Sequence, residues 1–187
     1  MNDRPVRVPV LVVGMGNRDR GDDGAGLAAA ARIGAASGVP VALLDAIGDG
    51  TALLDVWCGV DTVIVLDAMR SGAAAGTVRR LDAGLDGGLH HNAAGGKSAG
   101  TGHGPAKAAA TLGAGRNLGG STHGLGVAEA IALGDALGRL PRRLVIFGIE
   151  GRRFDAGTDL SPEAARAVDE AVRLGLEEVA DVPRPAG

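Results

Sequence analysis

The sequence contains one cysteine, Cys58, among 187 residues. A single thiol cannot form an internal disulfide, and it cannot supply the thiolates of a cysteine-based zinc site. A chain of this length can bury a core without either device, and we expect one domain over residues 1–187. One cysteine also suits a reducing compartment, which predicts a cytoplasmic location.

Aromatic residues and excess positive charge are also scarce. The sequence has Trp57, Phe147 and Phe154 but no tyrosine, which excludes extended stacking surfaces for bases or sugar rings. A net charge of -3 and a pI near 5.8 exclude a general basic surface for nucleic acid or anionic lipid. The core must therefore be built from Val, Leu, Ile and Ala.

Long apolar runs are absent as well. No stretch approaches the roughly 20 apolar residues that a membrane-spanning helix needs. Residues 1–10 contain two arginines but no apolar signal region followed by a cleavage site. We therefore expect a protein with neither a membrane nor a nucleic acid as its partner.

Short apolar runs alternate with helical patterns along the chain. The runs predict strands at residues 8–13, 41–44, 62–66, 77–81 and 143–149. Helices are predicted from residue 22 or 23 to about 38, and at residues 51–56, 121–137 and 162–179. This alternation indicates an α/β protein with a mostly parallel, twisted sheet of about five strands and helices on both faces.

Two segments depart from that regular pattern. The run at residues 77–81 contains Arg79 and Arg80, which need solvent on one side, so we expect an edge-like strand. Gly and Ala make up a little over half of residues 82–120, whose only large apolar residues are four leucines. Such a segment cannot bury a core, and we interpret it as a flexible insertion.

The glycine-rich turn after the first strand first suggests a nucleotide site. Gly14 and Gly16 follow a strand and precede a helix, where a phosphate could bind the helix N-terminus. However, Asp19 occupies the position of the third glycine of the dinucleotide motif. Together with Asp22 and Asp23 it places three negative charges where a pyrophosphate would lie. The charges favour a cation over a nucleotide.

Two carboxylates and a histidine form the second candidate site. Ligands of parallel sheets bind at the carboxyl ends of the strands, where the topology can bring together Asp23, Asp67 and His123. Such a set suits a divalent ion such as zinc, nickel or manganese. Taken singly, each residue fits a structural role better: a helix cap for Asp23, a turn for Asp67 and a surface position for His123.

Residues 11–17, Leu-Val-Val-Gly-Met-Gly-Asn, and residues 21–26, Gly-Asp-Asp-Gly-Ala-Gly, resemble the N-terminal signature of the nickel-iron hydrogenase maturation endopeptidases. Gly-x-Gly-Asn and Asp-Asp-Gly-x-Gly occur together at this family's spacing. Further matches follow at residues 65–68, 122–125, 147–150 and 160–163. The resemblance covers nearly the whole chain outside residues 82–120.

The resemblance implies a three-layer α/β/α fold of the phosphorylase/hydrolase-like kind. Members of the family that the chain resembles remove a C-terminal extension from the nickel-iron hydrogenase large-subunit precursor after nickel has been inserted. The resemblance implies that Asp23, Asp67 and His123 contact a nickel ion that the precursor carries, with zinc or cadmium as substitutes in vitro. We accordingly expect Asp23 to be catalytic, Asp22 to cap the following helix, and the first loop to be shaped by Gly14, Gly16, Asn17 and Gly24.

Two features depart from the family pattern, and several roles stay open. The charged stretch at residues 18–20 lies where relatives are often more apolar, and the segment at residues 82–120 is long. The metal could polarise the scissile carbonyl or acidify a water, or a carboxylate could act as the base. The alternatives to an endopeptidase are a non-proteolytic metal- or nucleotide-binding module and another hydrolase of related fold.

Overall fold

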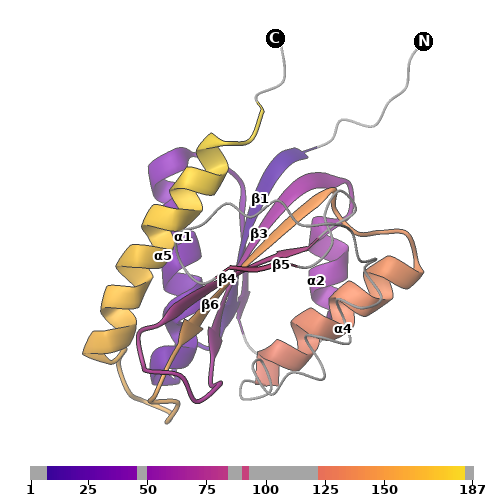
Figure 1. The fold of residues 1–187 in the computed structure, drawn as a ribbon. Helices are drawn as coiled ribbons and strands as arrows, with labels where there is room; N and C mark the ends of the chain where they lie inside the picture. Colours follow the sequence, from indigo (N-terminus) through magenta and orange to yellow (C-terminus); the bar gives the residue numbers. More distant parts are fainter. Residues whose placement is uncertain (1–7, 46–49, 84–89, 93–121, 184–187) are drawn as a thin grey trace, which may run out of the picture.

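The computed structural model describes residues 8–45, 50–83, 90–92 and 122–183. It contains a six-stranded sheet with the order β2-β1-β3-β6-β4-β5, between two layers of helices (Figure 1). The strands are β1 (Val8–Gly16), β2 (Val41–Asp45), β3 (Val60–Met69), β4 (Val78–Ala83), β5 (His90–Asn92) and β6 (Arg143–Glu150). The helices are η1 (Gly21–Gly24), α1 (Ala25–Ser37), α2 (Gly50–Trp57), α4 (Thr122–Ala136) and α5 (Pro162–Ala180).

The predicted fold class is confirmed. β2, β1, β3 and β6 pair in parallel, while β4 runs antiparallel to both β6 and β5. β4 was expected at an edge, and that expectation is wrong: β5 forms backbone pairs on its outer side. The predicted loop at residues 82–120 also begins too early, because residues 82–83 belong to β4 and residues 90–92 form β5. The rest of that prediction lies outside the described residues.

Alternation along the strands divides the core into two apolar clusters. Buried side chains of β1 and β3 at odd positions, such as Val13 and Val65, pack against α2 and α4. Even positions, such as Val12 and Ile64, pack against α1 and α5. Because successive side chains of a strand point to opposite faces, the position of any residue on β3 predicts which helices it meets.

Glycine allows α1 to lie very close to the sheet. A Cβ at Gly14 would approach the Cβ of Ala30 and the carbonyl oxygen of Gly26 at 2.7 and 2.8 Å. A Cβ at Gly26 would overlap the carbonyl oxygens of Leu66 and Met15. The first turn of α1 is therefore fixed against the ends of β1 and β3, which places the preceding loop at the edge of the sheet.

The ends of two helices follow local sequence rules. Ser161 caps α5 by accepting a hydrogen bond from the Ala164 amide, and Pro162 occupies the first turn, as predicted. α1 ends at Gly38, whose left-handed conformation (φ 72°) suits glycine. Within the described part of the chain, no helix combines the length and apolar character that crossing a membrane requires.

Candidate active site

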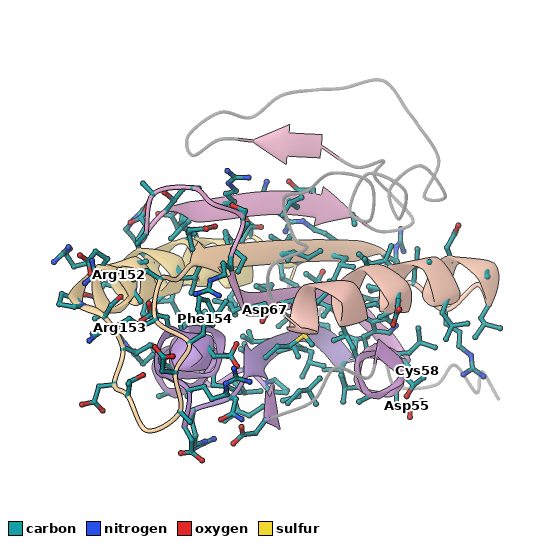
Figure 2. The ribbon with its side chains drawn as sticks, turned by 90° about the horizontal axis from the view of Figure 1, so that it is seen from below. Asp55, Cys58, Asp67, Arg152, Arg153 and Phe154 are labelled. Carbon is teal, nitrogen blue, oxygen red and sulfur yellow. The ribbon has the colours of Figure 1, made fainter. Side chains whose placement is uncertain are left out.

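The carboxyl ends of β1, β3 and β6 lie at one edge of the sheet. α4 reaches the same edge with its N-terminus, because its other end is joined to the start of β6 through residues 137–142 alone. Figure 2 shows this edge from below, with Asp67 lying toward the N-terminal end of α4. The topology therefore brings the predicted site elements together, in the place where parallel sheets bind ligands.

Asp67 is a buried carboxylate among the last three residues of β3. The residue is 5% exposed, and its neighbour across the sheet is Gly148 of β6. The strand continues to Met69, so Asp67 lies inside β3 and not after it. Since Val65 and Met69 belong to the cluster under α2 and α4, the alternation assigns Asp67 to that face.

The first loop is shaped by Gly16 and Asn17. Gly16 has φ 134°, and a Cβ there would overlap the carbonyl oxygen of Asp23, so no other residue fits. The Asn17 side-chain oxygen accepts a hydrogen bond from the Asp19 amide at 2.9 Å. The backbone carbonyl of Asn17 accepts one from the Arg20 amide. These contacts turn the chain back across the end of β1 and bring Asp23 over it.

Asp23 lies in η1, which contacts the ends of both β1 and β3. Asp23 is 4% exposed, although it belongs to a short helix within a loop. Gly24 allows this packing, because a Cβ there would come within 3.1 Å of the Arg18 Cα. Asp23 and Asp67 thus approach the same edge from different elements and are equally buried.

Asp22 does not cap α1, so that prediction is wrong. The N-cap position of α1 is Gly24, and no side chain caps it. Asp22 is fully buried and points instead to the loop after β6. Its Oδ2 accepts hydrogen bonds from the amides of Arg152 and Arg153 at 2.8 and 2.9 Å and from the Ser161 hydroxyl at 2.9 Å, while its Oδ1 accepts the Ser161 amide at 2.6 Å.

These hydrogen bonds control the charge of Asp22. Burial alone would raise the pKa of this carboxyl, because desolvation disfavours the charged form. The amides of Arg152, Arg153 and Ser161 and the Ser161 hydroxyl outweigh that effect, so the pKa of Asp22 is lowered from its ordinary value. Asp22 is therefore a permanent anion at neutral pH whose oxygens are occupied by its own chain.

Glu150 is a further buried acid, whose role was not predicted from the sequence. It ends β6 and is 2% exposed. Its Oε1 accepts the amides of Ser71 and Gly72 at 2.8 and 2.9 Å, and its Oε2 accepts the Ser71 hydroxyl at 2.7 Å. Glu150 thereby holds the loop between β3 and β4, just as Asp22 holds the loop between β6 and α5.

The charged stretch at residues 18–20 is also attached to its surroundings. Arg18 forms an ion pair with Asp45 at the end of β2, at 2.9 Å. The Arg20 guanidinium donates a hydrogen bond to the carbonyl of Phe154. Arg70 lies over the Phe154 ring, 5.0 Å from its centroid, in a cation–π contact. Arg18 and Arg20 thus form contacts between loops around the site.

His123 is the second residue of α4, at the edge that carries Asp23 and Asp67. Its side chain lies outside the described atoms, so its approach to the two carboxylates stays a prediction. Among the side chains that are described, no three His, Cys, Asp or Glu residues form a metal-binding group. Asp23 and Asp67 could supply two oxygen ligands, and the third predicted ligand would come from α4.

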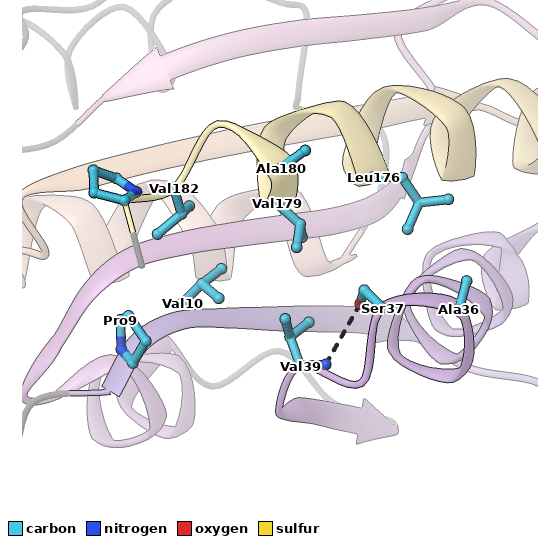
Figure 3. A pocket seen from close by; sticks show the side chains of 10 residues that line it. Pro9, Val10, Ala36, Ser37, Val39, Leu176, Val179, Ala180 and Val182 are labelled. Carbon is cyan, nitrogen blue, oxygen red and sulfur yellow. Dashed lines mark hydrogen bonds between the residues drawn. The ribbon is translucent and has the colours of Figure 1, made fainter. Parts of the chain in front are cut away.

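A cavity of about 550 Å³ lies beside the amino end of β1, whereas Asp23 and Asp67 lie at the carboxyl ends of the strands; Figure 3 shows its lining side chains. Its polar side chain is Ser37, which donates a hydrogen bond to the Ile33 carbonyl and accepts one from the Val39 amide. The remaining lining is apolar or proline: Pro9, Val10, Ala36, Val39, Leu176, Val179, Ala180, Val182 and Pro183. The cavity offers no catalytic group.

No protein-family model and no curated protein sequence matches the chain. Its fold, however, is similar to several solved structures. It aligns with the hydrogenase maturating endopeptidase HybD from E. coli with a TM-score of 0.65 and 21% identity, covering 92% of each chain. The NiFe hydrogenase maturation protease HybD from Thermococcus kodakarensis gives 0.54 and 24%, covering 92% of this chain and 99% of that one.

The endopeptidase HycI from Escherichia coli is similar as well, with a TM-score of 0.60 and 15% identity over 95% of this chain and 96% of that chain. At these identities the likeness demonstrates a shared fold. The chain therefore has the α/β/α fold of the hydrogenase maturation endopeptidases over nearly its full length, and the resemblance found in its motifs is confirmed at the level of fold.

Proposed function

We propose that the protein is an endopeptidase that removes the C-terminal extension of a nickel-iron hydrogenase large-subunit precursor after nickel insertion. The observation that carries this proposal is the pair of buried carboxylates, Asp23 and Asp67, at the carboxyl edge of a sheet with this fold. A hydrolase of peptide bonds needs a group that activates water, and a carboxylate can accept the proton.

In this proposal nickel belongs to the substrate. The precursor's cysteines hold the ion, and Asp23, Asp67 and His123 complete its coordination when the precursor docks. Carboxylates and imidazole are suitable ligands for such an ion. Zinc or cadmium in place of nickel would test how far the site depends on the metal's identity. Because the ion arrives with the precursor, only a metal-loaded precursor is cut.

The hydrolysis requires three things at the scissile bond: stabilisation of the carbonyl oxygen, removal of a proton from water, and donation of a proton to the departing amine. The carbonyl oxygen becomes more negative as water attacks, and a nearby cation stabilises that charge. A carboxylate takes the proton of the attacking water and passes it to the departing amine. We assign the proton transfer to Asp23, because it lies in the loop helix η1 that contacts β1 and β3, whereas Asp67 belongs to a strand of the sheet.

Mass spectrometry of a purified precursor tests this function. Nickel-loaded precursor mixed with the protein should lose a single C-terminal peptide, and nickel-free precursor should stay intact. Asp23→Asn, Asp67→Asn and His123→Ala should each lower the rate of cleavage by about a hundredfold or more. Asp55→Asn is the control, because Asp55 is an exposed acid on α2 that lies apart from Asp67 (Figure 2).

The same assay distinguishes the alternatives. An intact nickel-loaded precursor after prolonged incubation with wild-type protein would favour a non-proteolytic binding module. Cleavage of short peptides without any nickel-loaded partner would favour another hydrolase of related fold. We also propose a cytoplasmic location, in keeping with the single cysteine, and fractionation of cells tests it.

A further inference from the structure

Asp22 and Asp23 are adjacent in η1, and both are buried, yet Asp22 is committed to another part of the chain. Its carboxylate accepts four hydrogen bonds, all from residues 152–161. A carboxylate that accepts several backbone amides has its lone pairs occupied. Asp22 is therefore unsuited to binding a metal or accepting a proton.

The backbone of the first loop is attached to the same segment. The Gly21 amide donates to the Thr158 carbonyl at 3.0 Å, and the Asp22 amide donates to the Arg153 carbonyl at 2.7 Å. In the other direction, the Gly157 amide donates to the Asp19 carbonyl at 2.7 Å. Backbone hydrogen bonds thus join Asp19, Gly21 and Asp22 to residues 153–158 in both directions.

Two glycines make this close approach possible. Gly21 has φ 56°, and a Cβ there would lie 2.5 Å from the Thr158 hydroxyl oxygen. A Cβ at Gly151 would lie 2.7 Å from the Cβ of Asp22. Side chains at either position would push the two loops apart, so the sequence of both loops is adapted to this contact.

We propose that Asp22 is a positioning residue that fixes η1 to the β6–α5 loop and thereby sets the position of Asp23 for cleavage. This inference rests on the function proposed above. Since Asp22 and Asp23 share one short helix, a shift of one carboxylate moves the other. A displacement of about 1 Å at a reacting group can reduce a rate by about a hundredfold.

The test is Asp22→Asn, which keeps the size of the side chain but turns one oxygen into a donor group. That group would face the Ser161 amide or the amides of Arg152 and Arg153, so at least one hydrogen bond is lost. Cleavage of nickel-loaded precursor should fall at least tenfold in kcat, with KM within about threefold of wild type, because the precursor still docks.

The matched control is Val168→Ala on α5, which removes apolar volume from the core away from the carboxyl edge. Assays run at a temperature where both variants are folded should show an unchanged kcat for Val168→Ala. A kcat of Asp22→Asn equal to that of this control would overturn the positioning role. If Asp22→Asn does not fold, Ser161→Ala replaces it, because this change removes one of the four donors, and it should lower kcat to a smaller degree.

Hydrogen exchange separates this inference from the proposed function. In Asp22→Asn the amides of residues 20–24 should exchange faster than in wild type, whereas those of α5 should not. Wild-type protein that fails to cleave loaded precursor would contradict the proposed function alone. Unchanged exchange at residues 20–24 in Asp22→Asn would contradict the positioning role, whatever the reaction is.

Discussion

Four acids at the carboxyl edge of the sheet are almost equally buried, but they divide into two pairs. Asp22, Asp23, Asp67 and Glu150 are 0, 4, 5 and 2% exposed. Asp22 and Glu150, the anchor pair, use their oxygens to hold two loops through seven hydrogen bonds. Asp23 and Asp67, the central pair, lie where the ends of β1 and β3 meet η1.

The comparison shows that burial alone does not identify a functional carboxylate. A buried acid is stabilised when backbone amides donate to it, and such an acid can serve folding alone. The anchor pair fixes the loops beside the candidate site, and the central pair lies at the ends of the strands in that site. Substitutions in the two pairs should therefore have different effects. Changes to the central pair should mainly lower the cleavage rate, and changes to the anchor pair should first lower the free energy of unfolding.

The largest expected effect is the loss of activity on changing the central pair. Asp67→Asn should lower precursor cleavage by about 10²- to 10⁴-fold, because it removes a charge from the reacting region. Its thermal midpoint should change less than that of Asp22→Ala. Cleavage rate and thermal unfolding measured on the same samples check this. A variant that loses stability and keeps its rate per folded molecule would move Asp67 into the anchor pair.

A smaller effect should distinguish the two anchors from each other. In Glu150→Gln the amide oxygen can still accept the amides of Ser71 and Gly72, and its NH₂ can donate to the Ser71 hydroxyl, so the cost should be about 1 kcal/mol or less. In Asp22→Asn the new NH₂ group faces backbone amides that are also donors. This change should therefore lower the free energy of unfolding by about 2–3 kcal/mol. Urea unfolding measures both, and equal losses would refute the distinction.

The charge of Asp22 gives a pH-dependent contribution to stability. The pKa of Asp22 is lowered in the folded protein, so its stabilisation is fully present above its ordinary value of 3.8 and is lost as pH falls toward the folded pKa. The stability difference between wild type and Asp22→Asn should therefore shrink below about pH 4. Urea unfolding from pH 6 to pH 3 checks this, and a constant difference would contradict it.

The smallest effect is expected at an exposed ion pair. Arg32 of α1 and Asp169 of α5 are 2.7 Å apart, with side chains 51 and 66% exposed. A double-mutant cycle with Arg32→Ala and Asp169→Ala should give a coupling of about 0.5 kcal/mol that weakens at high salt. A coupling as large as the effect of Asp22→Asn would mean that burial adds little to the value of a carboxylate here.

The sequence predicted most of the fold because apolar periodicity and helix caps are local signals. The strand run before Gly14, the cap at Ser161 and the end of α1 at Gly38 all lie within a few residues of the features that define them. β5 could not be predicted this way. It is three residues long, and its pairing with β4 defines it, so no periodicity was available.

The site was predicted only in part, for a physical reason. The strand ends and the turn glycines place Asp23 and Asp67 at one edge, which the topology already indicated. The role of Asp22 was missed because its hydrogen-bond partners are 130–139 residues away along the chain. The local pattern of an acid before a helix favours a cap, and tertiary contacts overrode it. Glu150 was missed for the same reason, because its partners Ser71 and Gly72 are 78–79 residues away.

The position of β6 in the sheet has a consequence for synthesis of the protein. β6 lies between β3 and β4, although it is the last strand of the chain. While a ribosome is still making residues 1–142, β3 has an open edge and β4 has no strand on the side that β6 will fill. Open edges invite wrong pairing, and such distant contacts form slowly. Asp22 also lacks its hydrogen-bond donors until residues 152–161 have been made. A nascent chain should therefore acquire the proposed activity only after β6 and the following loop have emerged.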